Sequence, residues 1–233
     1  MLFVCNATKI LRCRAWEFEL LQHAAAPRWV DPLFRFSAAI VTAWFVTRTT
    51  QALYYNLHGN AYQQFILVLL VLSESISLIS IIVARQPVIR DVNPAYMVLT
   101  IVASFIVPLF ISVRGNTALV PPLVGDIASV ICVLWIIYAK LSLGRSFGLL
   151  AAKRVIKIKG AYNFVRHPIY AGYFSMYVVF LVTNYDTVNL AIILLHCCMQ
   201  IMRALREEAV LMADASYQDY CRSVPYRFVY GIV

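Results

Sequence analysis

Long apolar segments constrain this chain more than any other feature of its sequence. A membrane-spanning α-helix needs about 20 mostly apolar residues. Segments of this kind lie at roughly 36–57, 62–84, 94–113 and 119–139, and two shorter ones lie at roughly 168–183 and 188–205. The sequence therefore predicts an all-α fold: a multi-pass transmembrane helical bundle with six spans, or five if the first segment lies in the membrane interface.

The composition supports a membrane protein. Apolar residues make up 62% of the 233 residues and charged residues only 13%. Soluble domains are nearer half apolar and a quarter charged, and disordered chains are less apolar still. No repeat or separate soluble unit is visible, so we expect a single integral membrane domain over residues 1–233. The six cysteines show no CxxC spacing, which indicates neither a disulfide framework nor a metal site.

The basic residues predict how the chain is oriented. In so apolar a chain, the net charge of +9 favours contact with the anionic cytoplasmic face of a membrane over a nucleic-acid partner. The loop Lys140–Arg166 holds seven basic residues and no acidic one, whereas the predicted outer loops hold only Arg114. We therefore expect both termini in the cytoplasm and an amphipathic surface helix over residues 1–30. The compact chain and its short loops favour a bacterial inner membrane, or the endoplasmic reticulum in a eukaryote.

Two segments near the C-terminus carry polar residues in patterns that suggest a binding site. Arg166 and His167 precede Pro168, which can begin a helix, so they are expected at a helix N-terminus suited to an anionic group. In the last predicted span, polar residues spaced four, three and four apart share one helical face. They are His196, Gln200, Arg203 and Glu207. A simple ion pair would account for Arg203 and Glu207, and a buried imidazole with its hydrogen bonds made would account for His196. Four polar residues on one face of an otherwise apolar helix nevertheless favour a pocket.

These two segments resemble the isoprenylcysteine carboxyl methyltransferase family, which is related to phospholipid methyltransferases. The similarity covers residues 140–228 and leaves the spans of residues 1–139 without an assigned role. It lies in two motifs in particular, Arg166-His167-Pro168-Ile169-Tyr170-Ala171-Gly172 and Arg203-Ala204-Leu205-Arg206-Glu207-Glu208. The first also occurs in similar form in membrane sterol reductases, so its pairing with the second carries the specificity.

The resemblance implies a methyltransferase that uses S-adenosylmethionine as its cofactor and no metal. The basic loop, the segment around Arg166, the last helix and the C-terminal tail would enclose the cofactor. The residues expected to bind it are Tyr162, Arg166, His167, Pro168, Tyr170, Gly172, Glu207 and Glu208. Arg203 and Glu207 are the expected catalytic residues, and His196, Gln200 and Arg203 the expected substrate pocket. None of the eight glycines forms the G-x-G pattern of a soluble nucleotide-binding fold.

The expected methyl acceptor is a lipophilic or lipidated molecule that enters from the bilayer. Carboxyl O-methylation of an isoprenylcysteine-like or other lipidic acid is favoured, because an ionised carboxylate needs no general base and Arg203 can hold it. Phospholipid N-methylation is the alternative, with Glu207 or Glu208 as the base. An NADPH-dependent sterol-type reductase is the alternative from another class. Ile169 and the Glu207-Glu208 pair argue against the reductase.

Three further charged residues lie inside predicted spans: Arg48, Glu74 and Asp126. Charged residues at membrane depth are functional candidates by default. Arg48 and Glu74 fall at comparable depth on neighbouring spans, so an ion pair between them is the simplest prediction and a role in acceptor recognition the alternative.

Overall fold

The computed structural model describes residues 30–57, 60–85, 89–90, 93–106, 110, 117–146, 152–153 and 156–232. In these residues nearly all regular structure is helical, which confirms the predicted all-α class. The α-helices are α3 (Val30–Tyr55), α4 (Ala61–Ile82), α5 (Pro94–Ile101), α7 (Pro122–Leu143), α8 (Pro168–Thr183), α9 (Thr187–Leu211) and α10 (Ala215–Ser223). A π-helix, η1 (Val102–Ile106), continues α5, and two 3₁₀ turns are η2 (Gly144–Ser146) and η3 (Gly160–Asn163). One short antiparallel pair joins β1 (Ile89–Arg90) to β2 (Ala152–Lys153).

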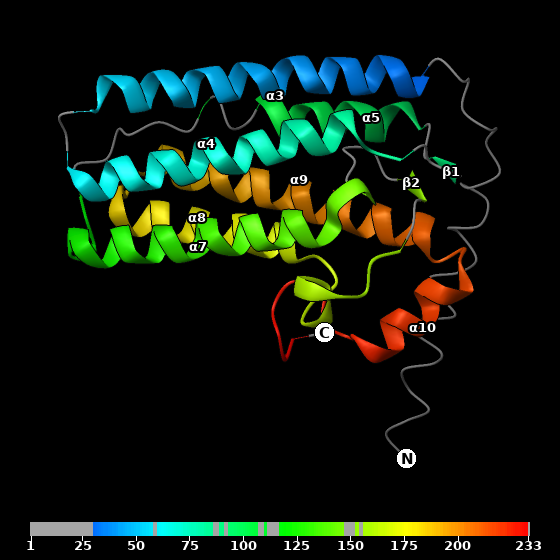
Figure 1. Cartoon of the computed structure of the whole chain (residues 1–233). Coiled ribbons are helices and arrows are strands. Elements are labelled where there is room, and N and C mark those ends of the chain that lie inside the picture. Colours follow the sequence, from blue (N-terminus) through cyan, green and yellow to red (C-terminus); the bar gives the residue numbers. More distant parts are fainter. Residues whose placement is uncertain are drawn as a thin grey trace.

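The long helices lie side by side with similar axis directions (Figure 1). Along this bundle α3 packs on α4, α4 on α7, α7 on α8, and α8 on α9. Helix α10, the β1–β2 pair and the C-terminus gather at one end of it (Figure 1). The segment that precedes α8 and the segment that follows α9 therefore meet at the same end of the bundle.

Within the described residues, three helical segments are long and apolar enough to cross a membrane: Ala61–Ile82, Pro122–Ser146 and Thr187–Leu211. Two more predicted spans correspond to apolar helices that are shorter, Pro94–Ser104 and Pro168–Thr183. Helix α3 has 26 residues but is less apolar than α4. Residues 1–29 of the predicted surface helix lie outside the described residues. In the third predicted span, residues 107–109 and 111–113 lie outside them as well.

The side chains of the bundle are distributed as a lipid environment requires. Large apolar side chains face outward on several helices; examples are Phe36, Phe65, Ile131 and Leu194. Small or polar residues are buried between the helices instead; examples are Thr42, Ser73, Ser77, Ala103 and Gly125. In lipid the hydrophobic effect does not drive helices together, so close approach at small residues and polar contacts hold them.

The C-terminal end of α4 is held by two arginines from other segments. Arg35 Nη2 on α3 donates to the carbonyl oxygens of Ile82 (2.9 Å) and Ala84 (2.8 Å), and Arg145 Nε donates to that of Val83 (3.2 Å). The last carbonyls of a helix have no partner within it and carry a partial negative charge, so cationic donors stabilise them. Part of the basic excess therefore has a structural use at this end of the bundle.

The charged residues inside the spans pair differently from the sequence prediction. Lys140, expected in the cytoplasmic loop, belongs to α7 and is fully buried. Its Nζ lies 2.8 Å from Ser73 Oγ and 3.3 Å from Glu74 Oε1. The predicted Arg48–Glu74 ion pair is therefore wrong, and the Arg48 guanidinium instead lies 5.9 Å from the ring centroid of Trp44.

Gly172 allows α8 to approach α7 closely. A Cβ at this position would lie 2.5 Å from Ile136 Cγ1 and 3.0 Å from Trp135 Cδ1, both of which belong to α7. Nearby, the indole N–H of Trp135 donates to the Pro168 carbonyl oxygen at 2.9 Å. The two helices are thus tied together at the end of α8 that carries Arg166 and His167.

Replacing Gly172 with Ala should lower stability, because the added methyl group forces α8 and α7 apart. Overpacking of this kind typically costs about 1–3 kcal/mol. The measurement is thermal unfolding of the detergent-purified protein. Ser175→Ala on an exposed position of the same helix is the matched control and should unfold like the wild type. Equal unfolding temperatures for the two variants would contradict the assigned packing.

Candidate functional site

A cavity of about 340 Å³ lies between the helices and the segments at the α10 end of the bundle. Its volume is in the range of pockets that bind small molecules. Eight residues predicted from the sequence as cofactor or substrate contacts line it: Tyr162, Arg166, His167, Tyr170, His196, Gln200, Arg203 and Glu207. The fold therefore brings the two sequence motifs to one cavity.

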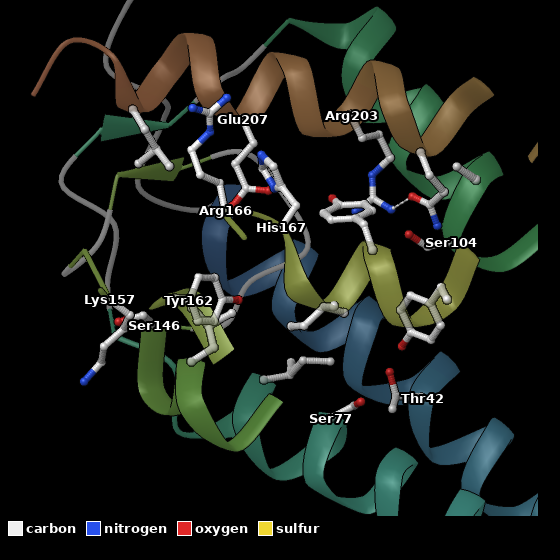
Figure 2. A pocket seen from close by; sticks show the side chains of 18 of the residues that line it. Thr42, Ser77, Ser104, Ser146, Lys157, Tyr162, Arg166, His167, Arg203 and Glu207 are labelled. Carbon is white, nitrogen blue, oxygen red and sulfur yellow. Dashed lines mark hydrogen bonds between the residues drawn. The ribbon is translucent and has the colours of Figure 1, made fainter. Parts of the chain in front are cut away.

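The cavity extends from the basic loop into the helix bundle. Figure 2 shows Lys157, Ser146 and Tyr162 on one side of it, and Thr42 and Ser104 on the other. Lys157 belongs to the loop before α8, whereas Thr42 lies within α3. One end can thus receive a polar molecule from the loop side, and the other lies among the helices of the bundle.

A buried carboxylate, Glu208, connects three segments around the cavity. Its Oε1 lies 2.8 Å from Arg166 Nε and 3.1 Å from His167 Nε2, and its Oε2 lies 3.0 Å from Arg227 Nε. The Glu208 side chain is only 5% exposed. A carboxylate buried this deeply requires such partners, so Glu208 fixes the positions of the Arg166 and His167 side chains.

The C-terminal tail, residues 224–232, covers the same segment through its backbone. The Arg166 N–H donates to the Tyr226 carbonyl at 2.8 Å, and the His167 N–H donates to the Arg227 carbonyl at 2.9 Å. The His167 ring also packs on Phe228, with centroids 5.5 Å apart. The tail therefore packs against Arg166 and His167, two residues of the cavity wall.

Three residues predicted to contact the cofactor do not line the cavity. Glu208 lies behind its wall and holds Arg166 and His167. Pro168 is fully buried as the first residue of α8, and Gly172 faces α7. These three support the site through positioning and packing.

The polar stripe on α9 forms a hydrogen-bonded series. Arg203 Nη1 donates to Gln200 Oε1 at 2.7 Å, so the amide nitrogen of Gln200 is the group that faces His196 Nε2, at 3.3 Å. The Tyr177 hydroxyl on α8 is 2.8 Å from the same Nε2. Both contacts converge on Nε2, which accepts in the tautomer that carries the proton on Nδ1 and donates to the Tyr177 hydroxyl in the other tautomer.

The imidazole of His196 is only partly satisfied. The ring is almost fully buried, and its Nδ1 has no hydrogen-bond partner in the part of the chain that the structure describes. The sequence alone allows a simpler interpretation of His196, a buried imidazole whose two ring nitrogens both have hydrogen-bond partners within the protein. A buried ring nitrogen without a hydrogen-bond partner can instead bind a polar group that these residues do not supply.

A cluster of tyrosines forms the wall at the loop end. Tyr162, Tyr217 and Tyr220 pack together, and the Tyr220 hydroxyl donates to the Tyr162 carbonyl oxygen at 2.7 Å. Burial raises the pKa of the Tyr162 hydroxyl well above its usual value, and the neighbouring Glu207 carboxylate raises it further. Burial likewise raises the pKa values of Tyr217 and Tyr220. These phenols therefore stay neutral near pH 7 and act as apolar walls and hydrogen-bonding groups.

Several lining residues were missing from the sequence prediction. Tyr173 and Tyr177 line the cavity from α8 beside the predicted Tyr170, and their spacing of three and four residues from it on one helical face could have revealed them. The contributions of Thr42 and Ser104 from distant helices carry no sequence signal that we can identify.

The charges around the cavity are mixed. Near Glu208, two arginines face one carboxylate, which leaves a net positive charge beside His167. Further along α9, Arg203 and Glu207 add one charge of each sign to the lining. The arrangement can therefore hold an anionic group near Arg166.

Comparisons with protein-family models and with curated proteins find no match to this chain. Over the described ranges, no three His, Cys, Asp or Glu residues lie close enough together to hold a metal ion. Function is therefore inferred from the chemistry of the cavity residues.

Replacing Glu208 with Gln should loosen the tail and destabilise the fold, because the positive charges of Arg166 and Arg227 lose their buried counter-charge. Breaking a buried ion pair typically costs about 3–5 kcal/mol. The measurements are thermal unfolding and the rate of tryptic cleavage after Arg227.

Asp219→Asn provides the matched control. It removes an acid that also pairs with an arginine, Arg222, at 2.9 Å, but both side chains are largely exposed. Exposed pairs contribute little, so this variant should behave like the wild type. Equal tryptic cleavage rates for the two variants would contradict the role given to Glu208.

Proposed function

We propose that this chain is a multi-pass membrane methyltransferase that transfers a methyl group from S-adenosylmethionine to a lipophilic acid. The observation that carries the proposal is the convergence of the Arg166–Tyr170 and Arg203–Glu207 segments on one cavity. The resemblance to isoprenylcysteine carboxyl methyltransferases supplies the chemistry.

The residues at the loop end suit S-adenosylmethionine. Arg166 offers a cation to the amino-acid carboxylate, and Glu207 offers an anion to the ammonium or sulfonium group. Tyr162 and Tyr170 provide aromatic faces, which attract cations. The cofactor, when bound, supplies an electrophilic methyl group on a positively charged sulfur.

Arg203 is proposed to hold the acceptor. Gln200 accepts a hydrogen bond from its Nη1, which orients the planar guanidinium, and a guanidinium fork matches a carboxylate in shape and charge. An acid is already ionised near neutral pH and needs no general base. The chain's own contribution is then to orient the carboxylate, exclude water behind the tail and remove part of its hydration.

The membrane arrangement is part of the proposal. The three long apolar helices, the three other helices beside them and the concentration of basic residues before α8 support six spans with both termini in the cytoplasm. The cavity would then open its loop end to the cytoplasm, from which the soluble cofactor arrives. Its inner end, near Thr42 and Ser104, would receive the acceptor from the bilayer.

Calorimetric titration of the detergent-purified protein tests cofactor binding. Saturable binding of S-adenosylmethionine, with none of NADPH, is the expected result. His167→Ala and Tyr170→Ala should weaken binding, because both side chains line the cavity and the second variant removes an aromatic face. Binding of NADPH alone would reassign the chain to the reductases, and binding of neither would contradict the proposal.

Replacing Arg203 with Ala should lower kcat by at least about 100-fold, the scale of loss when one charged donor is removed from a reaction centre. Arg203→Lys should retain part of the activity because it keeps the charge but loses the fork. Affinity for the methyl donor should change little in either variant. The control is Arg222→Ala, an exposed arginine on α10. A fully active Arg203→Ala enzyme would disprove the assigned role.

A further inference from the structure

Glu74 is a charged residue in a membrane-length helix that the proposed methyl transfer does not use. It lies on α4, within the segment Ala61–Ile82, and its side chain lines the same cavity as Arg203. Charged side chains at this depth are costly and are rarely retained without a specific partner or task. The partner is Lys140, whose Nζ lies 3.3 Å from Glu74 Oε1.

The Lys140 side chain is not available to a ligand. It is completely buried, and its ammonium group also contacts the carbonyl oxygen and the hydroxyl of Ser73 at 3.1 and 2.8 Å. The ammonium further lies 5.7 Å from the ring centroid of Tyr173. Lys140 thus supplies the counter-charge to Glu74 from behind the cavity wall.

The second carboxylate oxygen of Glu74 is open to the cavity. In the described part of the chain, the hydrogen bond of Glu74 goes to Lys140 through Oε1, and none is made by Oε2. The side chain is 28% exposed, although it belongs to a bundle interior that is otherwise closely packed. An ionised carboxylate oxygen accepts hydrogen bonds only, so its natural partner in the cavity is an N–H or O–H group.

The two long helices that supply Glu74 and Arg203 approach the cavity from different sides. Figure 2 shows Ser77, one turn beyond Glu74 on α4, below the cavity and Arg203 on α9 above it. A ligand between them meets a cationic donor on one side and an anionic acceptor on the other. A purely hydrocarbon chain in this position would leave the second Glu74 oxygen without a hydrogen-bond partner.

We propose that Glu74 is a specificity residue that accepts a hydrogen bond from a donor group on the acceptor. The acceptor class is then a lipidic acid that carries a second polar group, an O–H or N–H, in addition to the carboxylate held by Arg203. This inference rests on the proposed function for the role of Arg203. A binding site built to pair a polar group discriminates strongly against an analogue that lacks it, because a buried charge is then left unpaired.

The test is equilibrium binding, which needs neither the methyl donor nor turnover. Radiolabelled hexadecanoic acid is displaced from the purified protein by hydroxyhexadecanoic acids with the hydroxyl on the second, third, sixth or tenth carbon. Each is compared with its methoxy counterpart, which keeps the oxygen but cannot donate. At least one hydroxy acid should bind about tenfold more tightly than its methoxy partner, as expected for a hydrogen bond to a charged group.

The Glu74→Gln variant should reduce this preference to about threefold or less, because a neutral amide oxygen is a weaker acceptor. Asp126→Asn is the matched control, since Asp126 is an acid in α7 that does not line the cavity. It should keep the full preference. If Glu74→Gln does not fold, Glu74→Gln combined with Lys140→Met removes both buried charges together and serves the same comparison.

The inference would be overturned if the wild-type protein prefers no hydroxy acid over its methoxy partner, or binds none of the acids. It would also be overturned if the preference persists in Glu74→Gln. A purely structural Glu74 would lower the unfolding temperature without changing the ratio of affinities. Failure of the proposed function appears separately, as loss of methyl-donor binding in calorimetry.

Discussion

The paired, buried carboxylate of Glu208 is the contact on which the rest of the site depends. A charge in that position is tolerated only when Arg166, His167 and Arg227 surround it, so α9, the start of α8 and the C-terminal tail must come together. Once they do, the tail covers the His167 ring and the tyrosine cluster closes the loop end. One electrostatic requirement thereby produces both the cavity wall and the orientation of the residues that face inward.

A different constraint, an apolar surrounding such as lipid, explains the distribution of side chains in the helix bundle. Its outward faces carry large apolar side chains, so the polar groups of α4, α7, α8 and α9 have only one another as partners. Lys140, Glu74 and Ser73 form one such contact, and Tyr177, His196 and Gln200 form another. Both contacts border the cavity, and polar groups inside a bundle are where a membrane enzyme can recognise the polar part of a lipid.

Features that depend on local spacing could be predicted from the sequence. The four-three-four spacing on the last helix gave its polar face, and Pro168 gave the start of α8. Pairings between helices were not predictable. The sequence suggests Arg48 as the partner of Glu74, but the observed partner is Lys140. The burial of Lys140 depends on how α7 packs against α4, which no local spacing reveals. Glu207 belongs to the polar face of the last helix and lines the cavity, whereas Glu208 points about 100° away from it. The burial of Glu208 against Arg166, His167 and Arg227 depends on packing and could not be predicted.

The most direct test of the account is the chemical nature of the methylated product. Purified protein is incubated with methyl-labelled S-adenosylmethionine and a lipidic acid, and the extracted lipid is treated with mild alkali. Methyl esters release their label as volatile methanol under these conditions, whereas methylamines keep it. We expect label that enters the lipid fraction, is released by alkali and is absent with Arg203→Ala. Alkali-stable label would show methylation of an amine, and no label with any lipidic acid would contradict the account.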